Sequence, residues 1–352
     1  MQESPFKFLS AFEKEDYRFF FGREEETKAL YEMTYDTRLI LIYGASGTGK
    51  TSLVQCGLAN QFKETRWKEI FIRREQNINH SLQTILDQEL VKSGGIALGK
   101  PEDDVERINL IYKAIFKPIY LIFDQFEELF IINPNEIEQQ RFFQFVDGLL
   151  KSKAAAKIIL VMREEFIAQL SNFEQMIPGL FDHRFRVEAM RYTKAEAAIE
   201  KTLNKLAAAH QIEVAQPAAI AKIILQNLTN GKKKLELTYL QVYLDHLYQE
   251  AATKKGNTPL FTPQLVQQTG DFEDIIGEFL TDQIAEMEAK LGPGKKSIPI
   301  KVLGALITDE RTKKVINEED LDQLCQQLKI TRKDLDWCLQ TFENMRILKR
   351  YD

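Results

Sequence analysis

Residues 44–51 read Gly-Ala-Ser-Gly-Thr-Gly-Lys-Thr and match the pattern G-x-x-x-x-G-K-[ST] at every fixed position. Glycines in such a loop allow positive φ angles, so that the backbone N–H groups can surround a phosphate closely. The apolar run LILIY (39–43) precedes the loop, and apolar residues at helical spacing follow it over 51–62. This order of strand, loop and helix predicts a phosphate-binding site for a nucleotide.

Each position of the loop has an expected role. Lys50 would bridge the β- and γ-phosphates, and Thr51 would offer its hydroxyl to Mg²⁺. The positive end of the helix dipole would add to the attraction for the anion. The expected nucleotide-binding residues of this loop are Gly44, Ala45, Ser46, Gly47, Thr48, Gly49, Lys50, Thr51 and Ser52.

A second feature is the acidic end of another apolar run. Residues 119–123 (IYLIF) are apolar throughout, which suits a strand covered on both faces, and Asp124 follows directly. A carboxylate there would hold Mg²⁺ across from Thr51, so we expect Thr51 and Asp124 to form the metal site. The alternative is an aspartate that merely ends a strand.

The residues after Asp124 bear on hydrolysis. Gln125 stands where many ATPases of this broad class have a glutamate that polarises the attacking water, and acids follow at Glu127 and Glu128. One of these two acids could act as the base. Equally, both could stabilise the first turn of a following helix, where carboxylates are favoured. Slow or regulated hydrolysis is therefore the expectation.

A third apolar run, KIILVM (157–162), ends at Arg163. If this strand reaches the same edge as Asp124, the Arg163 guanidinium would lie near the γ-phosphate, where its permanent charge and planar donors are suited to reading it. The alternative is a structural ion pair with Glu164 or Glu165. Before the first strand, Gly22 and Arg23 follow two phenylalanines and are expected on the adenine side of the site, although such a segment could be an ordinary turn.

The wider pattern changes near residue 190. Up to that point strands expected at 39–43, 68–73, 119–123, 157–162 and 184–188 alternate with helices at 78–93, 103–116 and 136–150. This alternation predicts an α/β fold with a parallel sheet and helices on both faces. Later segments read as helices, with caps expected at Thr193 (with Glu196) and Thr262. These helices are expected from 193 to about 209 and at 217–229, 238–253, 271–290, 298–307, 317–328 and 331–343.

Composition narrows the class of protein. The 352 residues carry a net charge of −5, which supplies no overall basic field for nucleic acid or membrane surfaces. The chain has no uncharged apolar stretch near the ~18 residues that a membrane span needs. The three cysteines, Cys56, Cys325 and Cys338, are odd in number and lack C-x-x-C spacing, so a reducing, cytoplasmic location is expected.

Together these stretches resemble the novel STAND NTPases, which are signal-transduction ATPases within the AAA-like P-loop group. The resemblance implies binding of ATP and ADP with Mg²⁺ in a P-loop nucleotide-binding domain (1–190), followed by a helical lid (191–255) and a winged-helix domain (256–352). In the last of these, Thr331 with Asp334 would cap a helix, and RILKR (346–350) would start the wing. The resemblance is carried by FFGREEE (20–26), GASGTGKTSLVQCGL (44–58), LIFDQFEELF (121–130) and LVMREEF (160–166).

The resemblance also implies a switch that is closed with ADP and opens and oligomerises with ATP. Thr238 departs from it, because the family's lid usually has a proline there. The sequence stops at Tyr351-Asp352, before the expected second wing strand and the usual sensor or effector domains, which favours the core of a longer protein. Two alternatives remain: a nucleotide-binding scaffold with negligible hydrolysis, and an AAA-type ATPase that acts on nucleic acid. The few basic residues of 331–343 speak against the second.

Overall fold

The computed structural model shows a chain that forms two compact units, Met1–Gln267 and Gln268–Asp352. The three-domain division expected from the sequence, with boundaries near 190 and 255, stays a prediction. The described residues are 4–344 and 347–348, apart from 9, 132–133, 230–234, 254–257, 271, 293–294, 296, 308–313, 315 and 318–319.

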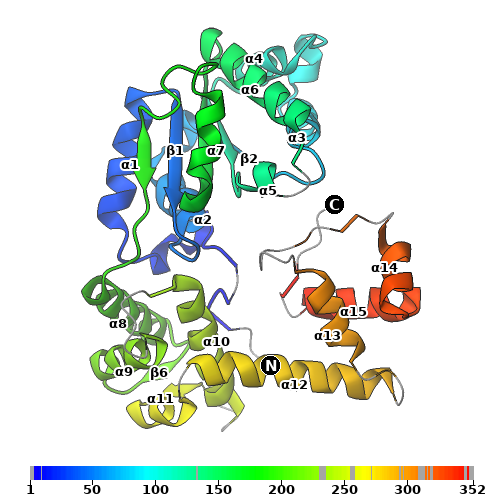
Figure 1. The fold of residues 1–352 in the computed structure, drawn as a ribbon. Helices are drawn as coiled ribbons and strands as arrows, with labels where there is room; N and C mark the ends of the chain where they lie inside the picture. The colour runs from blue at the N-terminus through cyan, green and yellow to red at the C-terminus, as the bar shows by residue number, and fades with distance from the viewer. Residues whose placement is uncertain are drawn as a thin grey trace. The chain divides into compact units, whose positions relative to one another are not determined.

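The first unit is built on a five-stranded parallel sheet with strand order β2-β3-β4-β1-β5 within the described residues (Figure 1). All five expected strands are present, so the predicted parallel sheet is confirmed. Strand β4 lies between β1, which leads into the phosphate loop, and β3, which ends before Asp124. The strands are β1 (Leu39–Gly44), β2 (Lys68–Ile72), β3 (Ile119–Phe123), β4 (Ala156–Arg163) and β5 (Arg184–Arg186).

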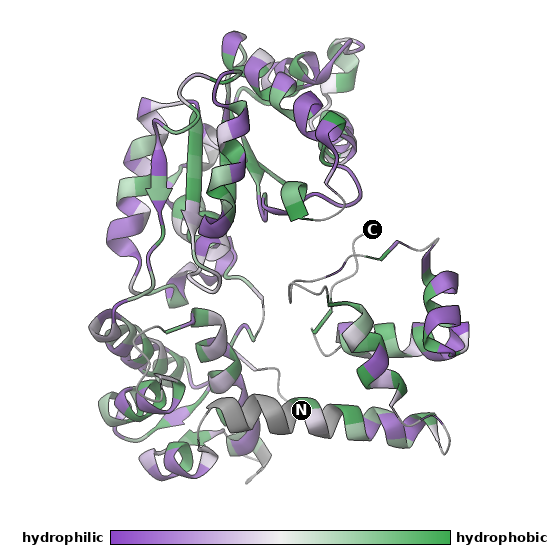
Figure 2. Ribbon diagram, in the orientation of Figure 1, coloured by the Kyte–Doolittle hydropathy of each residue, from purple (hydrophilic) through white to green (hydrophobic). Residues whose placement is uncertain are grey.

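Helices cover both faces of this sheet, and neighbouring strand residues enter different cores. Leu41 and Leu121 belong to the core on one face, whereas Ile42 and Ile122 belong to the core on the other. This explains why the central strands are apolar at successive positions, as Figure 2 shows. The first core also contains residues of α3 (Ile78–Lys92), α4 (Asp104–Ile115), α6 (Glu136–Lys151) and α7 (Ile167–Leu170), and the second contains residues of α1 (Glu24–Asp36).

The segment after the phosphate loop differs from the single helix expected over 51–62. Helix α2 (Lys50–Ser52) continues as a π-helical stretch over Leu53–Leu58 and a 3₁₀ turn over Ala59–Gln61. Gly57 lies where this stretch packs on its neighbours, since a Cβ there would be 2.7 Å from the Thr27 hydroxyl oxygen. Helix α1 can therefore approach this closely only because Gly57 has no side chain.

Residues 191–267, which we call the helical region, complete the first unit. One expectation was wrong here: Thr193 does not cap its helix, because α8 already begins at Tyr192 and its N-cap is Arg191. The Thr262 cap is confirmed, since the Leu265 N–H donates to its hydroxyl at 3.1 Å. The elements are α8 (Tyr192–Ala208), β6 (Glu213–Val214), α9 (Pro217–Thr229), α10 (Leu237–Thr253), β7 (Leu260–Phe261) and α11 (Pro263–Thr269).

The second unit is helical in its described residues. Its core includes Val302, Leu335 and Phe342, and the Asp334 N–H donates to the Thr331 hydroxyl at 3.2 Å, as expected for a capped helix. Of the predicted wing strand, only residues 347–348 are described, as a bend, and 346 and 349–352 lie outside the described residues. The winged helix thus stays a prediction. The helices are α12 (Phe272–Leu291), α13 (Ile298–Ala305), α14 (Leu321–Leu328) and α15 (Arg332–Asn344).

Among the described residues, no helix combines the length and the apolar character that crossing a membrane requires.

Candidate functional site

The phosphate loop leaves the carboxyl end of β1 and has the backbone geometry that its glycines permit. Gly47 and Gly49 have φ angles of +71° and +84°, in the left-handed region. Gly44 is needed for a different reason, because a Cβ there would lie 2.3 Å from the carbonyl oxygen of Val187. Helix α2 begins directly afterwards at Lys50, so its N-terminus faces the loop.

Lys50 is held within the loop. Its ammonium donates to the carbonyl oxygens of Gly44 and Ala45, at 2.9 and 2.8 Å. Burial lowers the pKa of Lys50, whereas the nearby Glu127 carboxylate opposes this shift. Phosphate oxygens accept stronger hydrogen bonds from an ammonium than peptide carbonyls do, so a phosphate in the loop would compete for this lysine.

Asp124 and Thr51 come together as the sequence predicts. The Thr51 hydroxyl donates to Asp124 Oδ1 at 2.9 Å, and only 3 % of Asp124 is exposed. A carboxylate and a hydroxyl are oxygen ligands of the kind that Mg²⁺ accepts, with phosphate oxygens and water completing its shell. The donor set therefore fits a magnesium ion bound together with a nucleotide.

Arg73 joins this pair and was missed by the sequence reasoning. Its guanidinium donates to Asp124 Oδ2 through Nε at 3.1 Å and also through Nη2. Arg73 directly follows β2, which neighbours β3 in the sheet. A sequence signal did exist, since Arg73 is the last residue of the strand expected at 68–73, but it becomes informative only once β2 is known to lie beside β3.

Glu127 and Glu128 occupy different environments. Glu127 is buried and forms an ion pair with Arg163, whose Nε lies 3.1 Å from Glu127 Oε1. The Arg163 backbone N–H donates to Glu127 Oε2 at 3.3 Å, and burial raises the pKa of Glu127. Glu128 is the first residue of α5 (Glu128–Ile131), the position where a carboxylate stabilises a helix. Both side chains are buried; Glu128 lies at a helix start, as the second alternative expects, and Glu127 is the acid paired with Arg163.

Arg163 ends β4 opposite Gly44 in the register of β1, at the same edge as the phosphate loop. The ion-pair alternative assigned it to Glu164 or Glu165, but the structure pairs it with Glu127. Glu164 instead pairs with Arg186 at 2.9 Å. The pair of Arg163 and Glu127 places a guanidinium and a carboxylate side by side at the carboxyl edge of the sheet.

Gly22 and Arg23 lie beside the phosphate loop, and Arg23 is hydrogen-bonded to it. Arg23 is buried, and its Nη2 donates to the carbonyl oxygens of Thr48 and Glu188, at 2.9 and 2.8 Å. Gly22 has a φ angle of +83° and packs against Met190. Contact of either residue with a nucleotide stays a prediction, and the observed role of Arg23 is to connect the loop to residue 188.

The helical region touches the phosphate loop directly. The N–H of Leu237, the first residue of α10, donates to the carbonyl oxygen of Gly47 at 3.0 Å. The side chain of Glu236 covers Gly47, with Oε2 3.2 Å from the place that a Cβ would take. The Leu237 side chain approaches Gly49 in the same way, at 3.2 Å. Thr238 follows in the first turn of α10.

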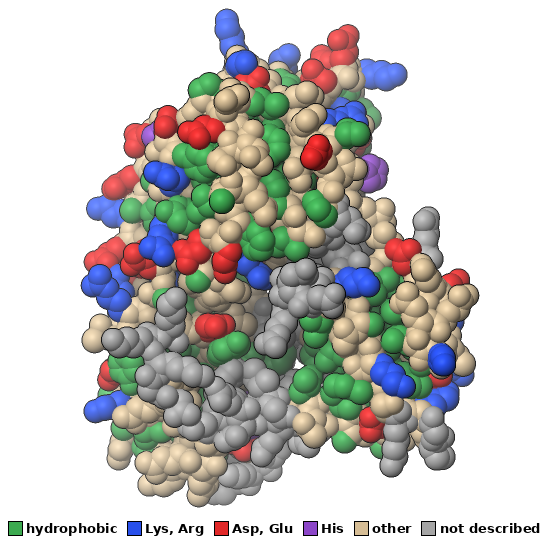
Figure 3. Space-filling model, in the orientation of Figure 1, with side chains coloured by type: hydrophobic (Ala, Val, Ile, Leu, Met, Phe, Trp, Pro, Cys, Tyr) green, Lys and Arg blue, Asp and Glu red, His purple; other side chains and the backbone are tan. Residues whose placement is uncertain are grey.

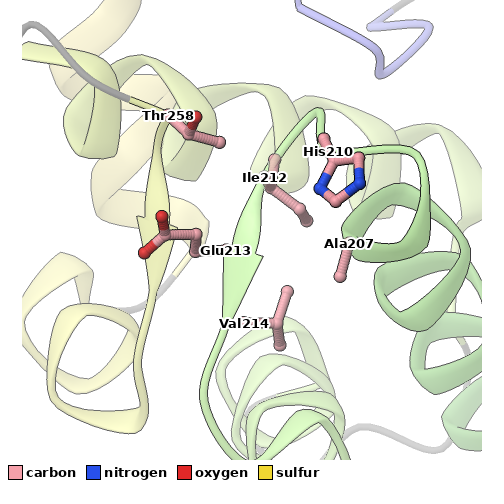
Figure 4. Close-up of a pocket in the computed structure, with 6 residues that line it drawn as sticks. All are labelled: Ala207, His210, Ile212, Glu213, Val214 and Thr258. Atoms are coloured by element: carbon pink, nitrogen blue, oxygen red, sulfur yellow. The ribbon is translucent and has the colours of Figure 1, made fainter.

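A pocket of about 300 Å³ lies elsewhere, within the helical region (Figure 4). It contains none of the expected site residues and lies at the end of α8 and along β6, so it is separate from the phosphate loop. Its lining residues are Ala207, His210, Ile212, Glu213, Val214 and Thr258.

Solved structures with the same fold share little sequence identity with this chain. The Aeropyrum pernix ORC2 protein, described in ADPNP–ADP complexes, is 14 % identical with a TM-score of 0.51, covering 93 % of this chain and 95 % of its own. A Walker-type ATPase of Pyrococcus abyssi is 15 % identical with a TM-score of 0.52, covering 98 % and 94 %. The Aeropyrum pernix ORC1 protein in complex with DNA is 12 % identical with a TM-score of 0.50, covering 93 % and 84 %. These likenesses establish the fold.

The family is shown by the sequence itself. A comparison with curated proteins finds no match. The family model described as Novel STAND NTPase 1 matches residues 5–350, a span that contains the phosphate loop, Asp124 and the helical region. With the five-stranded order and the assembled site, this match confirms the resemblance, and the chain belongs to the novel STAND NTPase 1 family.

Proposed function

We propose that this protein is a Mg²⁺-dependent, ATP- and ADP-binding switch whose nucleotide state is read by the helical region. The observation that carries the proposal is the hydrogen bond from the Leu237 N–H to the Gly47 carbonyl. The same eight-residue loop that would surround the phosphates thereby also holds the start of α10. A change of phosphate in the loop would change this contact.

The residues of the loop and sheet edge have distinct parts in this proposal. The loop N–H groups and Lys50 would bind the phosphates, and Thr51 and Asp124 would hold the metal ion. The bound Mg²⁺ would supply positive charge to the phosphate oxygens. Glu127 would orient a water molecule and accept its proton at a carboxylate oxygen, since burial raises the pKa of Glu127 and makes it a better base. Arg163 would contact the γ-phosphate.

The proposed signalling cycle is the one that membership of the family implies. ADP would keep the helical region against the loop, and exchange for ATP would release it and expose a surface for oligomerisation with further copies of the chain. Sensor or effector domains would supply the stimulus and the output. A cytoplasmic location is part of the same proposal, and the cysteines Cys56, Cys325 and Cys338, which are free and buried, are compatible with it.

Equilibrium binding of fluorescent ADP and ATP tests the site. We expect Lys50→Ala to weaken binding of both by at least about tenfold, because the phosphates lose their ammonium. Asp124→Ala should abolish the Mg²⁺ dependence of binding. Lys151→Ala, at an exposed position on α6, serves as the control. Wild-type affinity and wild-type Mg²⁺ dependence in both site variants would refute the assignment.

Phosphate release separates the switch that hydrolyses ATP from a scaffold with negligible turnover. We expect Glu127→Gln to abolish release and Glu128→Gln to retain it, because Glu127 forms an ion pair with Arg163 at the sheet edge, whereas Glu128 begins α5. Absence of release by the wild-type protein, despite tight ATP binding, would support the scaffold.

Action on nucleic acid is less favoured by the surface. Figure 3 shows acidic and basic side chains interspersed over the face in view, and the chain has 52 acidic against 47 basic residues. A DNA-binding surface generally gathers positive charge. Binding of DNA that falls steeply with salt, or ATP hydrolysis stimulated by DNA, would reverse this judgement.

A further inference from the structure

The carboxylate proposed to hold the metal ion is already engaged on both oxygens. Asp124 Oδ1 accepts from the Thr51 hydroxyl at 2.9 Å, and Oδ2 accepts from Arg73 through Nε at 3.1 Å and through Nη2. Only 3 % of the Asp124 side chain is exposed, against 25 % for Arg73. A buried carboxylate without a cation is costly, so the guanidinium compensates a charge that would otherwise stand alone.

The position of Arg73 is set by its neighbour. Arg74 forms a two-bond ion pair with Glu138 at 2.8 and 2.9 Å, with side chains 3 % and 2 % exposed. Glu138 also accepts from the Ile78 N–H at the start of α3, at 2.7 Å. This buried pair anchors the chain just after β2, while the preceding residue, Arg73, reaches Asp124 at the end of the adjacent strand β3.

We propose that Arg73 is a metal-exchange residue: its guanidinium occupies Asp124 in the absence of metal and must release Oδ2 when Mg²⁺ binds with the nucleotide. This inference rests on the proposed function. A divalent cation and a guanidinium at hydrogen-bond distance from one carboxylate repel each other. Arginine does not lose its proton at any ordinary pH, so the conflict is resolved by movement of the side chain. Arg73 thereby sets the Mg²⁺ concentration at which the site fills.

The test is a Mg²⁺ titration of fluorescent ADP binding by the full chain. We expect Arg73→Gln to lower the half-saturating Mg²⁺ concentration by about tenfold, because a repelling charge is removed. Arg73→Lys keeps that charge and should remain within about twofold of wild type. Arg141→Gln removes the same charge from an exposed position on α6 and should leave the titration unchanged. Thermal unfolding of each variant, followed by circular dichroism, verifies that it is folded.

A second measurement, ADP and ATP affinity in EDTA, separates the metal from the phosphate. Since Arg73 is assigned to the carboxylate, Arg73→Gln should bind metal-free ADP and ATP like the wild type. Loss of metal-free ATP affinity would overturn the inference and assign Arg73 to the phosphates. The inference would also be overturned if Arg73→Gln needed as much Mg²⁺ for half-saturation as Arg141→Gln, or more. Failure of the wild-type protein to bind nucleotide at all, or to respond to Mg²⁺, would instead defeat the proposed function itself.

Discussion

The carboxyl edge of the sheet and the helical region meet at the phosphate loop, but they are built in different ways. At the sheet edge, charged side chains from separate strands pair with one another, as in Arg73 with Asp124 and Arg163 with Glu127. The helical region reaches the same loop through a backbone hydrogen bond from Leu237 and through the covering side chain of Glu236. The side-chain pairs gather opposite charges where phosphates and a metal ion would bind, whereas the loss of one backbone hydrogen bond costs only about 0.5–1.5 kcal/mol. The sheet edge is thus suited to chemistry and the helical region to switching.

The largest effect is expected where the sheet edge loses a buried charge. Glu138→Ala leaves the Arg74 guanidinium unpaired in the interior and should lower the free energy of unfolding by about 3–5 kcal/mol. Glu25→Gln removes one partner of Lys194 in an exposed pair between α1 and α8 and should leave the free energy of unfolding nearly unchanged. Urea unfolding measures both. Equal losses would mean that the two regions do not differ as described.

A smaller effect is expected at the start of the phosphate loop. Gly44→Ala places a methyl group against the Val187 carbonyl and should destabilise the protein by about 1–3 kcal/mol. Because the loop must shift to relieve this contact, nucleotide affinity should fall as well. Gly148→Ala is the matched control, since nothing lies within 4 Å of a Cβ there. Full stability and full affinity in Gly44→Ala would contradict the close approach.

The contact made by the helical region can be removed by one substitution. Leu237→Pro deletes the N–H that donates to Gly47 at the first position of α10, where proline is compatible with a helix. The loss of one hydrogen bond costs about 0.5–1.5 kcal/mol of stabilisation. We therefore expect ADP to be released a few-fold faster, as measured by stopped-flow fluorescence. Leu237→Ala keeps the N–H, removes the side chain and separates the two contributions. If the proline variant released ADP at the wild-type rate, the hydrogen bond from Leu237 to Gly47 would have no part in the switch.

The smallest effect is a pH dependence at the sheet edge. Burial raises the pKa of Glu127 in the folded protein above its ordinary value of 4.5, so the folded state holds this proton more tightly than the unfolded state. This group therefore makes the free energy of unfolding fall as pH rises from 4.5 to the raised pKa. Glu127→Gln should remove that part of the slope. Parallel pH curves for the two proteins would show that Glu127 is not desolvated.

Particular elements show how far sequence reasoning reached. The apolar runs predict β1, β3 and β4 to within a residue or two, because strands buried on both faces are apolar at every position. The prediction of a cap at Thr193 was wrong, because the helix already begins at Tyr192 and the capping pattern of Thr193 and Glu196 carries no information on that. The alternative for Arg163 was an ion pair within its own segment, with Glu164 or Glu165, but its observed partner, Glu127, follows a different strand.

The phosphate loop was predictable from eight consecutive residues, which carry the glycines, the lysine and the hydroxyl that a phosphate site needs. The sequence also determined that Asp124 ends a buried strand. Only the folded structure shows that Arg73 binds Asp124, that Glu127 pairs with Arg163, and that α10 begins against Gly47. The physical reason is that these contacts depend on the order β2-β3-β4-β1-β5 and on chain reversals, which bring distant residues together without any local signal.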